Sequence, residues 1–239
     1  MAFNNAKNIL VGASPLYVSV KDSTDPTYVE NLLDTPSTGI AFTARTAAAT
    51  TLDAASTKVR NVGYTNNGLQ ITYNPTYDSV TVDQLLDTAK LFKSAMEVMI
   101  ATELAEGTLA NVLTVFGQGG STLTKAGATS TDQYPTKGAT GADDRDLTLG
   151  MEAGALGIQP TERQLFAVGT APTLAKGTST EVNATTERVY YARRVLSVQQ
   201  SQFSLARNTP TTFPVTFRLL PDAAYTGSEY GKIIDRVLA

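Results

Sequence analysis

The sequence predicts a mainly β protein: an antiparallel β-sandwich or split barrel with one flanking α-helix. Short segments of alternating apolar and polar residues recur along the chain between Gly, Pro and Asn, which is the pattern of strands and turns. In one segment, which ends at Phe116, the apolar residues have helical spacing and a helix-ending residue follows. A length of 239 residues suits one large β domain, so we expect a single domain over residues 1–239.

The first half is expected to hold a short strand and then a meander. Pro15–Val20 alternates like a strand, whereas residues 43–58 are rich in Ala and Thr and are expected to form an arm or loop. Val59–Val82 reads as strands with a hairpin turn at Asn66-Asn67-Gly68, because Asn-Gly favours the positive φ angles of a type I′ turn. The aromatic residues of the strand-like runs, Tyr64, Tyr73 and Tyr77 among them, are expected to pack in the core and to pair across strands.

The segment from Asp83 to Phe116 fits two patterns. Residues 85–94 have helical spacing and their state stays open, while Ala95–Leu104 alternates as a strand would. We expect a helix over Ala105–Phe116 that stops at Gly117. Glu106 would then lie in the first turn of this helix, where the macrodipole favours a negative charge.

Residues 118–145 are rich in Gly, Thr and Ser, and we expect a long loop insertion there. The rest of the chain is strand-like again. The expected strands are Asp146–Ala153, Arg163–Gly169, Arg188–Val198 and Thr211–Leu220, followed by a last strand or short helix over Tyr230–Val237.

The composition argues against an enzyme. The chain has no Cys, no His and no Trp, so it lacks thiol nucleophiles, the commonest general base and the commonest ligands of transition metals. A net charge of −3 argues against a basic surface that captures nucleic acid. No stretch approaches the roughly 20 apolar residues that cross a bilayer, and no secretory signal is visible. We expect no cofactor and no membrane contact.

Three local patterns could carry chemistry, and a structural reading is favoured for each. Gly117–Ser121 is rich in glycine but lacks the spacing of a phosphate loop. Asp143–Asp146 could hold a divalent cation, yet Arg145 sits within it, which favours a charge cluster. Glu103 and Glu106 could pair for acid–base work, but on a strand they would point to opposite faces.

Three stretches together resemble the major tail tube proteins of long-tailed bacteriophages (siphoviruses), especially those of actinobacterial hosts. The resemblance spans roughly residues 8–117 and 187–237. It rests on Val59–Tyr73 with Val80–Gln84, on Met96–Leu113, and on Phe213–Asp222 with Tyr230–Arg236. The residues that match the family's pattern are Leu104, Ala105 and Glu106, then Thr108, Leu109 and Asn111, and near the end Tyr230, Gly231 and Asp235.

The resemblance implies a structural subunit that assembles with itself into hexameric rings, which stack into a channel for DNA ejection. It also implies contacts with the tape measure, terminator and distal tail proteins, a location in the virion tail, and assembly in the host cytoplasm. DNA would pass without specific binding; six copies would carry −18, and we expect much of this charge to face the lumen and repel phosphate. The alternatives are another virion structural protein, such as a capsid decoration or head–tail connector subunit, and a β-sandwich binding module.

Overall fold

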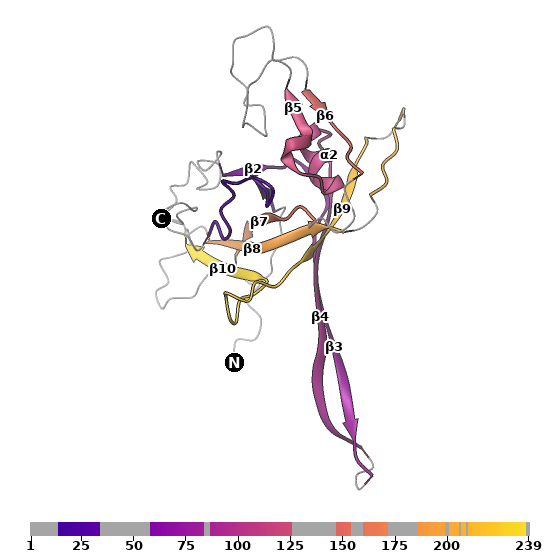
Figure 1. Ribbon diagram of the computed structural model, residues 1–239, viewed down its shortest axis with the longest axis vertical. Helices are drawn as coiled ribbons and strands as arrows, with labels where there is room; N and C mark the ends of the chain where they lie inside the picture. Colours follow the sequence, from indigo (N-terminus) through magenta and orange to yellow (C-terminus); the bar gives the residue numbers. More distant parts are fainter. Residues whose placement is uncertain are drawn as a thin grey trace, which may run out of the picture.

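The protein is seen in a computed structural model that describes residues 14–33, 58–83, 87–125, 147–153, 160–171, 186–198, 201–205, 207–208 and 210–237. Figure 1 shows a β-rich body from which one long hairpin projects. The strands are β1 (Leu16–Ser19), β2 (Val59–Asn61), β3 (Thr65–Thr81), β4 (Thr88–Leu104), β5 (Leu123–Lys125), β6 (Leu147–Leu149), β7 (Arg163–Thr170), β8 (Thr186–Ser197), β9 (Phe213–Leu219) and β10 (Gly231–Val237); the helices are α2 (Leu109–Phe116) and the short 3-10 helix η2 (Gly120–Thr122).

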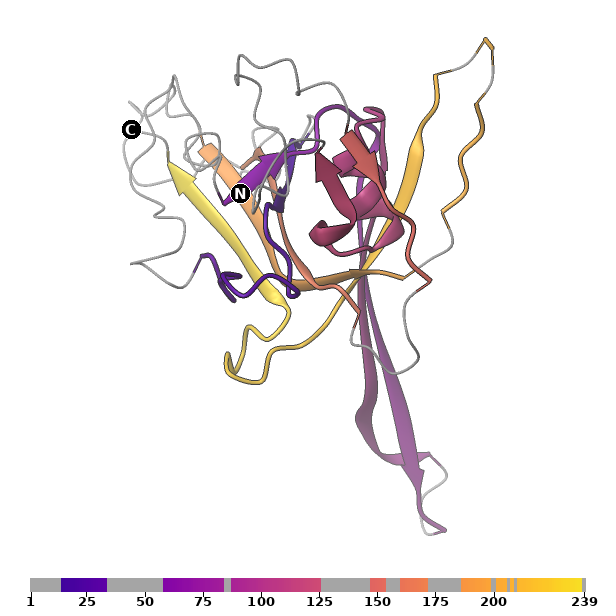
Figure 2. The same cartoon turned by 45° about the horizontal axis from the view of Figure 1, so that its top comes forward.

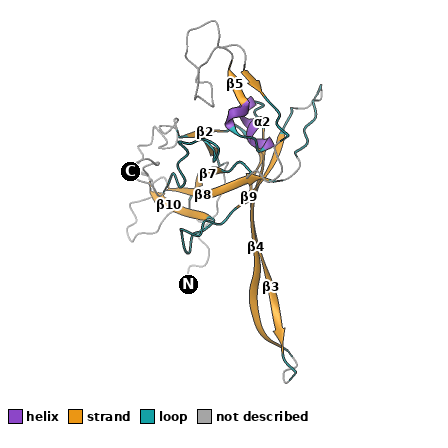
Figure 3. Cartoon of the chain, in the orientation of Figure 1, coloured by secondary structure: helices purple, strands orange, loops and turns teal. Residues whose placement is uncertain are grey.

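Eight of these strands form one antiparallel sheet. Its order is β2-β1-β7-β8-β9-β4-β3, and β10 pairs with β8 beside β9. The strands β5 and β6 form a separate two-stranded sheet next to α2. The mainly β, antiparallel architecture with a flanking helix confirms the fold class expected from the sequence (Figure 3).

The main core lies inside the curl of this sheet. It contains Leu16 and Val18 of β1, Leu165 of β7, Val195 of β8 and Phe217 of β9, together with residues of β4. Strands that lie far apart in the sheet order therefore turn the same face toward one core, as in a sandwich (Figure 2). A second cluster covers the other face of β1, β7 and β8, where the segment of residues 29–33 packs on Phe166 and Tyr191.

The helix α2 closes the main core through Val115 and Val112. The Thr108 side chain caps its N-terminus by accepting a hydrogen bond from the Asn111 backbone N–H, and Gly117 ends it with a φ of 66°. The predicted stop at Gly117 is confirmed. The start is wrong by four residues, because residues 105–108 form an extended corner before the helix.

The Asn66-Asn67-Gly68 segment is not a hairpin turn. Asn67 and Gly68 do adopt positive φ angles, 59° and 68°, as the turn chemistry predicts. However, Asn66 pairs with Glu103 and Gln70 pairs with Ala101, so both flanking residues pair with the same strand, β4. Since β4 is long enough to pair on both sides of it, the local turn becomes a bulge within β3.

The open question over residues 85–94 is settled from Thr88 onward, because β4 begins there and runs to Leu104. The predicted strand over Ala95–Leu104 is therefore confirmed and extended. Of the predicted loop at 118–145, the structure describes residues 118–125, which form η2 and β5, and residues 126–145 lie outside the described part. The predicted arm at 43–58 also lies outside it, apart from Lys58. The strand predicted over Asp146–Ala153 is reduced to β6.

Candidate assembly surface

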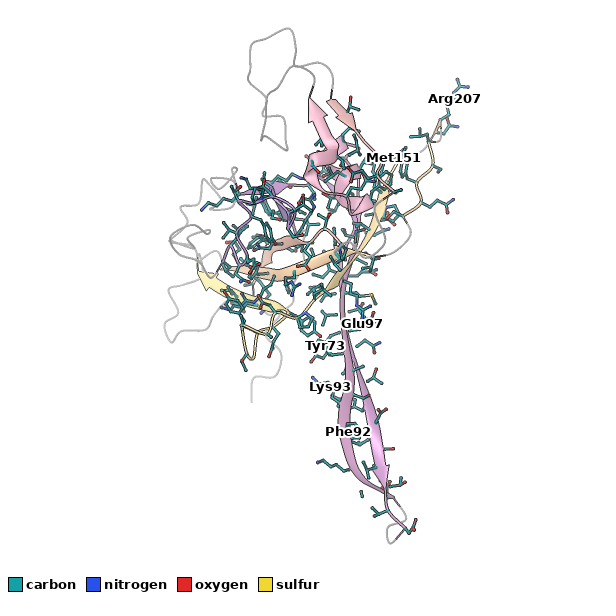
Figure 4. The ribbon with its side chains drawn as sticks, in the orientation of Figure 1. Tyr73, Phe92, Lys93, Glu97, Met151 and Arg207 are labelled. Carbon is teal, nitrogen blue, oxygen red and sulfur yellow. The ribbon has the colours of Figure 1, made fainter. Side chains whose placement is uncertain are left out.

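The β3–β4 hairpin leaves the body and runs free of it for most of its length. Each strand has 17 residues, and they pair from Thr65 with Leu104 out to Thr81 with Thr88. In β4 every side chain from Thr88 to Ala95 is exposed, and the alternation of buried positions begins only at Val98. Figure 4 labels Tyr73, Phe92, Lys93 and Glu97 along this hairpin, and Phe92 and Lys93 lie clear of the body.

The stem of the hairpin, Ile71–Tyr77 of β3 with Lys93–Ile100 of β4, has two unlike faces. Successive side chains of a strand point to opposite faces, and directly paired residues share a face. Ile71 pairs with Ile100 and Tyr73 with Val98, and Ile100 and Val98 are buried in the main core. One face of the stem is therefore an outward continuation of the core side of the sheet.

The core-side face of the stem is apolar except for Lys93, which pairs with Tyr77 at its outer end. On β3 it carries Ile71, Tyr73, Pro75 and Tyr77. The exposed fractions are 45% for Ile71, 64% for Tyr73 and 58% for Tyr77. A single chain therefore leaves large apolar side chains in water along a surface that continues its own core.

The opposite face of the stem is polar. On β3 it carries Thr72, Asn74 and Thr76, and Asn74 pairs with Glu97 of β4. The Glu97 carboxylate lies 3.8 Å from the Arg218 guanidinium of β9. Within the described part of the chain, no helix covers this face, because α2 packs on β5, β6, β8 and β9.

Beyond the stem, the hairpin tip carries apolar side chains on both faces. Leu91 lies on the core-side face, opposite Ser79, whereas Phe92 and Val80 lie on the other face. A β-bulge lies near the outer end of the stem, because Thr76 pairs with Ala95 whereas Tyr77 pairs with Lys93.

The strand β3 is also an edge of the main sheet. Among the described strands its only partner is β4, so the backbone groups on its outer side have no strand partner there. Such an edge is a template for pairing with another chain. The strand β10 has the same property on the side away from β8, and Ile233 on it is 65% exposed.

Six of the residues that carry the family resemblance meet in one corner at the base of the hairpin. Leu104 ends β4 in the core, and the Ala105 N–H donates to the Tyr64 carbonyl at 2.9 Å. The Thr108 side chain caps α2, and Leu109 begins the helix. Asn111 is fully buried, and Glu106 lies beside Gly63.

Asn111 holds this corner together. Its amide nitrogen donates to the Val62 carbonyl at 2.8 Å and to the Glu106 carbonyl at 2.9 Å. Its amide oxygen accepts from the Arg60 guanidinium at 2.5 Å. One side chain thus joins β2, the end of β4 and α2, which sets the direction in which the hairpin leaves the body.

Glu106 does not lie in the first turn of the helix, so that prediction is wrong. The first turn of α2 contains no acidic residue. The Glu106 carboxylate instead accepts a hydrogen bond from the Tyr64 backbone N–H at 3.0 Å. It occupies the space that a side chain at Gly63 would need, so a tertiary contact has replaced the helix-dipole contact.

The other three residues of the resemblance fasten β10 to β8. The Tyr230 carbonyl accepts from the Arg193 N–H at 3.2 Å. Gly231 has a φ of 149°, and a Cβ there would collide with the Tyr191 carbonyl. Asp235 accepts two hydrogen bonds from Arg188, at 2.6 and 2.7 Å. This guanidinium lowers the pKa of Asp235 below its usual value.

None of the sequence patterns weighed for chemistry forms a reactive site in the described residues. Glu103 bonds to the Asn66 side chain at 3.1 Å, away from the contact that Glu106 makes. The Gly117–Ser121 segment runs from the helix end into η2, and Asp143–Asp146 lies outside the described part. No group of three or more potential metal ligands occurs among the residues that the structure describes.

One polar cavity of about 220 Å³ lies between the segment of residues 28–31 and the end of β9. Both of its arginines are engaged by other protein groups. Arg194 makes two hydrogen bonds of 2.6 Å to Glu162, and the buried Arg193 stacks on the Tyr225 ring at 3.8 Å. These pairs make the cavity part of the scaffold.

The structure also corrects the expectation for three aromatic residues. The expected cross-strand pairing is present for Tyr73 with Val98 and for Tyr77 with Lys93. The expected core packing is wrong, because Tyr64 is 81% exposed and the other two lie on the free stem. The alternation that places Tyr73 and Tyr77 on one face is visible in the sequence. Only the tertiary structure shows that nothing in the described body covers this face.

The chain matches none of the protein families with which it was compared, and no curated protein matches it. Within the described residues, no helix has the length and apolar character needed to span a membrane.

Proposed function

We propose that the chain is the structural subunit of a bacteriophage tail tube. Its copies form hexameric rings, and the rings stack into a channel through which DNA is ejected. The observation that carries the proposal is the β3–β4 hairpin, which presents an apolar face and an unpaired strand edge to solvent. The resemblance of the hairpin base and of the β10 segment to tail tube proteins supports the same assignment.

A free hairpin of this length calls for a partner. A two-stranded ribbon is marginally stable in water by itself, and a third strand or a packed face stabilises it. Here the body supports only the base of the ribbon, near Val98 and Ile100. A neighbouring copy that packs on the stem would supply the missing support and cover the exposed edge, and ring closure would leave no copy with an open edge.

The composition supports a structural role without chemistry. The chain offers no thiol and no imidazole, and the polar stem face carries mostly uncharged Thr and Asn. A weakly acidic protein does not hold the DNA backbone by counterion release, which suits passage of DNA without binding. In this proposal the subunit is not an enzyme. It lies in the virion tail after assembly in the host cytoplasm, and it meets the tape measure, terminator and distal tail proteins at defined points of the tube.

The test compares the full chain with a hairpin-shortened variant. Since Asn74 pairs with Glu97, residues 75–96 can be replaced by an Asn-Gly turn that keeps the register at the base. We expect the full chain to form six-fold rings or tubes in electron micrographs and to sediment as an assembly. The shortened chain loses the contact of Met96 with the main core, so its monomer should still unfold in one cooperative transition at a slightly lower temperature, yet stay a monomer.

Two outcomes would overturn the proposal. A full chain that stays monomeric at high concentration would reject self-assembly as its function. Tubes that form equally well from the shortened chain would show that the hairpin is not the assembly element, and the observation on which the proposal rests would be lost.

A further inference from the structure

We infer, resting on the proposed function, that the two faces of the stem have different neighbours in the ring. The apolar face packs on an adjacent copy of this chain. The polar face stays in water and lines the bore.

The apolar face fits a second copy because it continues the core of the first. Ile71 and Tyr73 are paired with two buried core residues of β4, Ile100 and Val98, so the surface that covers the stem extends the same apolar layer. The exposed parts of Ile71, Tyr73 and Tyr77 together amount to roughly 300 Å², given that a buried aromatic side chain covers about 150–250 Å². This is a little over a third of the roughly 800 Å² that each partner contributes to a standard interface. The strand pairing at the β3 edge would add to it.

The polar face has the opposite character. On the stem and the neighbouring β9 its charged residues are Glu97 and Arg218, whose side chains lie 3.8 Å apart. Thr72, Asn74 and Thr76 are uncharged. Burying this face against protein would cost the hydration of these polar groups. Facing the bore, it stays hydrated, and a single cation already paired with a carboxylate gives the DNA backbone no array of cations to bind.

The assignment covers the stem, which ends at the pair of Tyr77 and Lys93 just past the bulge at Ser94. Beyond this pair, Leu91 lies on one face of the tip and Phe92 on the other. A tip with apolar side chains on both faces is expected to lie between two protein surfaces and away from the bore.

Two adjacent residues provide a matched pair of variants. Tyr73 and Asn74 are both exposed in the single chain and point to opposite faces, so a glutamate at either position should leave the isolated fold intact. We expect Tyr73→Glu to reduce the assembled fraction in sedimentation at least tenfold. Asn74→Glu should assemble like the unaltered chain, and both monomers should unfold at the unaltered temperature.

Cysteine labelling gives a second readout, because the chain has no cysteine of its own. In assembled rings a small maleimide should react with Asn74→Cys and spare Tyr73→Cys. When the rings are dissociated, both should react at similar rates. A Tyr73→Cys chain that still assembles keeps this measurement independent of the glutamate variants.

The outcomes separate the inference from the proposed function. An unaltered chain that never assembles rejects the proposed function itself. If the unaltered chain assembles and both glutamate variants assemble equally well, or if Asn74→Glu alone blocks assembly, the face assignment is wrong while the function stands. Equal maleimide protection of both cysteines in the rings would also overturn it.

Discussion

Replacing Asn111 with alanine is expected to destabilise the subunit by about 3 kcal/mol, because this buried amide joins three elements. The substitution removes the hydrogen bonds to the Val62 and Glu106 carbonyls and the one from the Arg60 guanidinium. The two carbonyls and the guanidinium would then lose a partner in a site that water does not reach freely, since Asn111 is 1% exposed.

The magnitude follows from these three contacts. Each of the two neutral hydrogen bonds is worth about 1 kcal/mol net, and the charged one about 2 kcal/mol. Alanine is the better helix former by about 0.6 kcal/mol, which offsets part of the loss. The net cost of about 3 kcal/mol corresponds to a decrease of about 9 °C in the unfolding temperature for a chain of this size.

The assay is urea unfolding followed by circular dichroism, at concentrations where sedimentation shows a monomer. This condition matters because assembly would add its own stabilisation. Asn74→Ala is the matched control, since the same side chain is removed from an exposed position on the stem. Its effect should stay within about 0.5 kcal/mol.

A loss below about 1 kcal/mol for Asn111→Ala would refute the reasoning. It would mean that the carbonyls and the guanidinium find other partners, and that the corner does not depend on this amide. In that case the direction of the hairpin would have to be set by the packing of Leu104 and Val115 in the core.

Three further predictions concern the body. Gly231→Ala should destabilise the chain by about 2 kcal/mol or more, because a Cβ there collides with a β8 carbonyl. The control Gly227→Ala, at a position with a φ of 83° and open space around it, should cost about 1 kcal/mol. Similar unfolding temperatures for the two variants would contradict this. Arg188 lowers the pKa of Asp235, so the pair stabilises the fold above the ordinary pKa of 3.8 and ceases to do so as pH falls through the lower folded value. The difference in urea midpoint between the unaltered chain and Asp235→Asn should therefore be present at neutral pH and disappear in strong acid. A difference that stays constant with pH would argue against this prediction. Burial raises the pKa of Tyr28 to about 12, so its neutral form stabilises the fold below the ordinary pKa of 10.0, and this contribution is lost between the two values. Tyr28→Phe should remove one late phenolate transition from an absorbance titration. An unchanged titration curve would exclude a raised pKa for Tyr28.

Local patterns predicted the elements well where the reason for each element is local. The helix end at Gly117 follows from the ease with which glycine adopts positive φ, and the structure has 66° there. The alternation in Arg163–Gly169 predicted β7 almost to the residue. The positive φ angles of Asn67 and Gly68 were also correct, since they depend on the residues themselves.

The errors came from partners that lie far away in the sequence. The Asn-Gly segment became a bulge because the chain pairs with β4 on both sides of it. Distant pairing also settled residues 88–94, which the sequence left open between helix and strand, because pairing with β3 supplies their backbone hydrogen bonds. Glu106 bonds to Tyr64, which is 42 positions away, and no local rule anticipates that contact.

The sequence alone determined a mainly β chain with one helix, poor in groups for catalysis, whose stem strand alternates between an apolar and a polar face. These properties depend on residue type and on short-range periodicity, so they can be read without knowing what lies nearby. Tertiary structure decided that this strand extends past the end of the body, which turns a predicted core face into an exposed one. The exposure of this face depends on how far the other strands extend, because an apolar side chain is buried only where other atoms of the fold cover it.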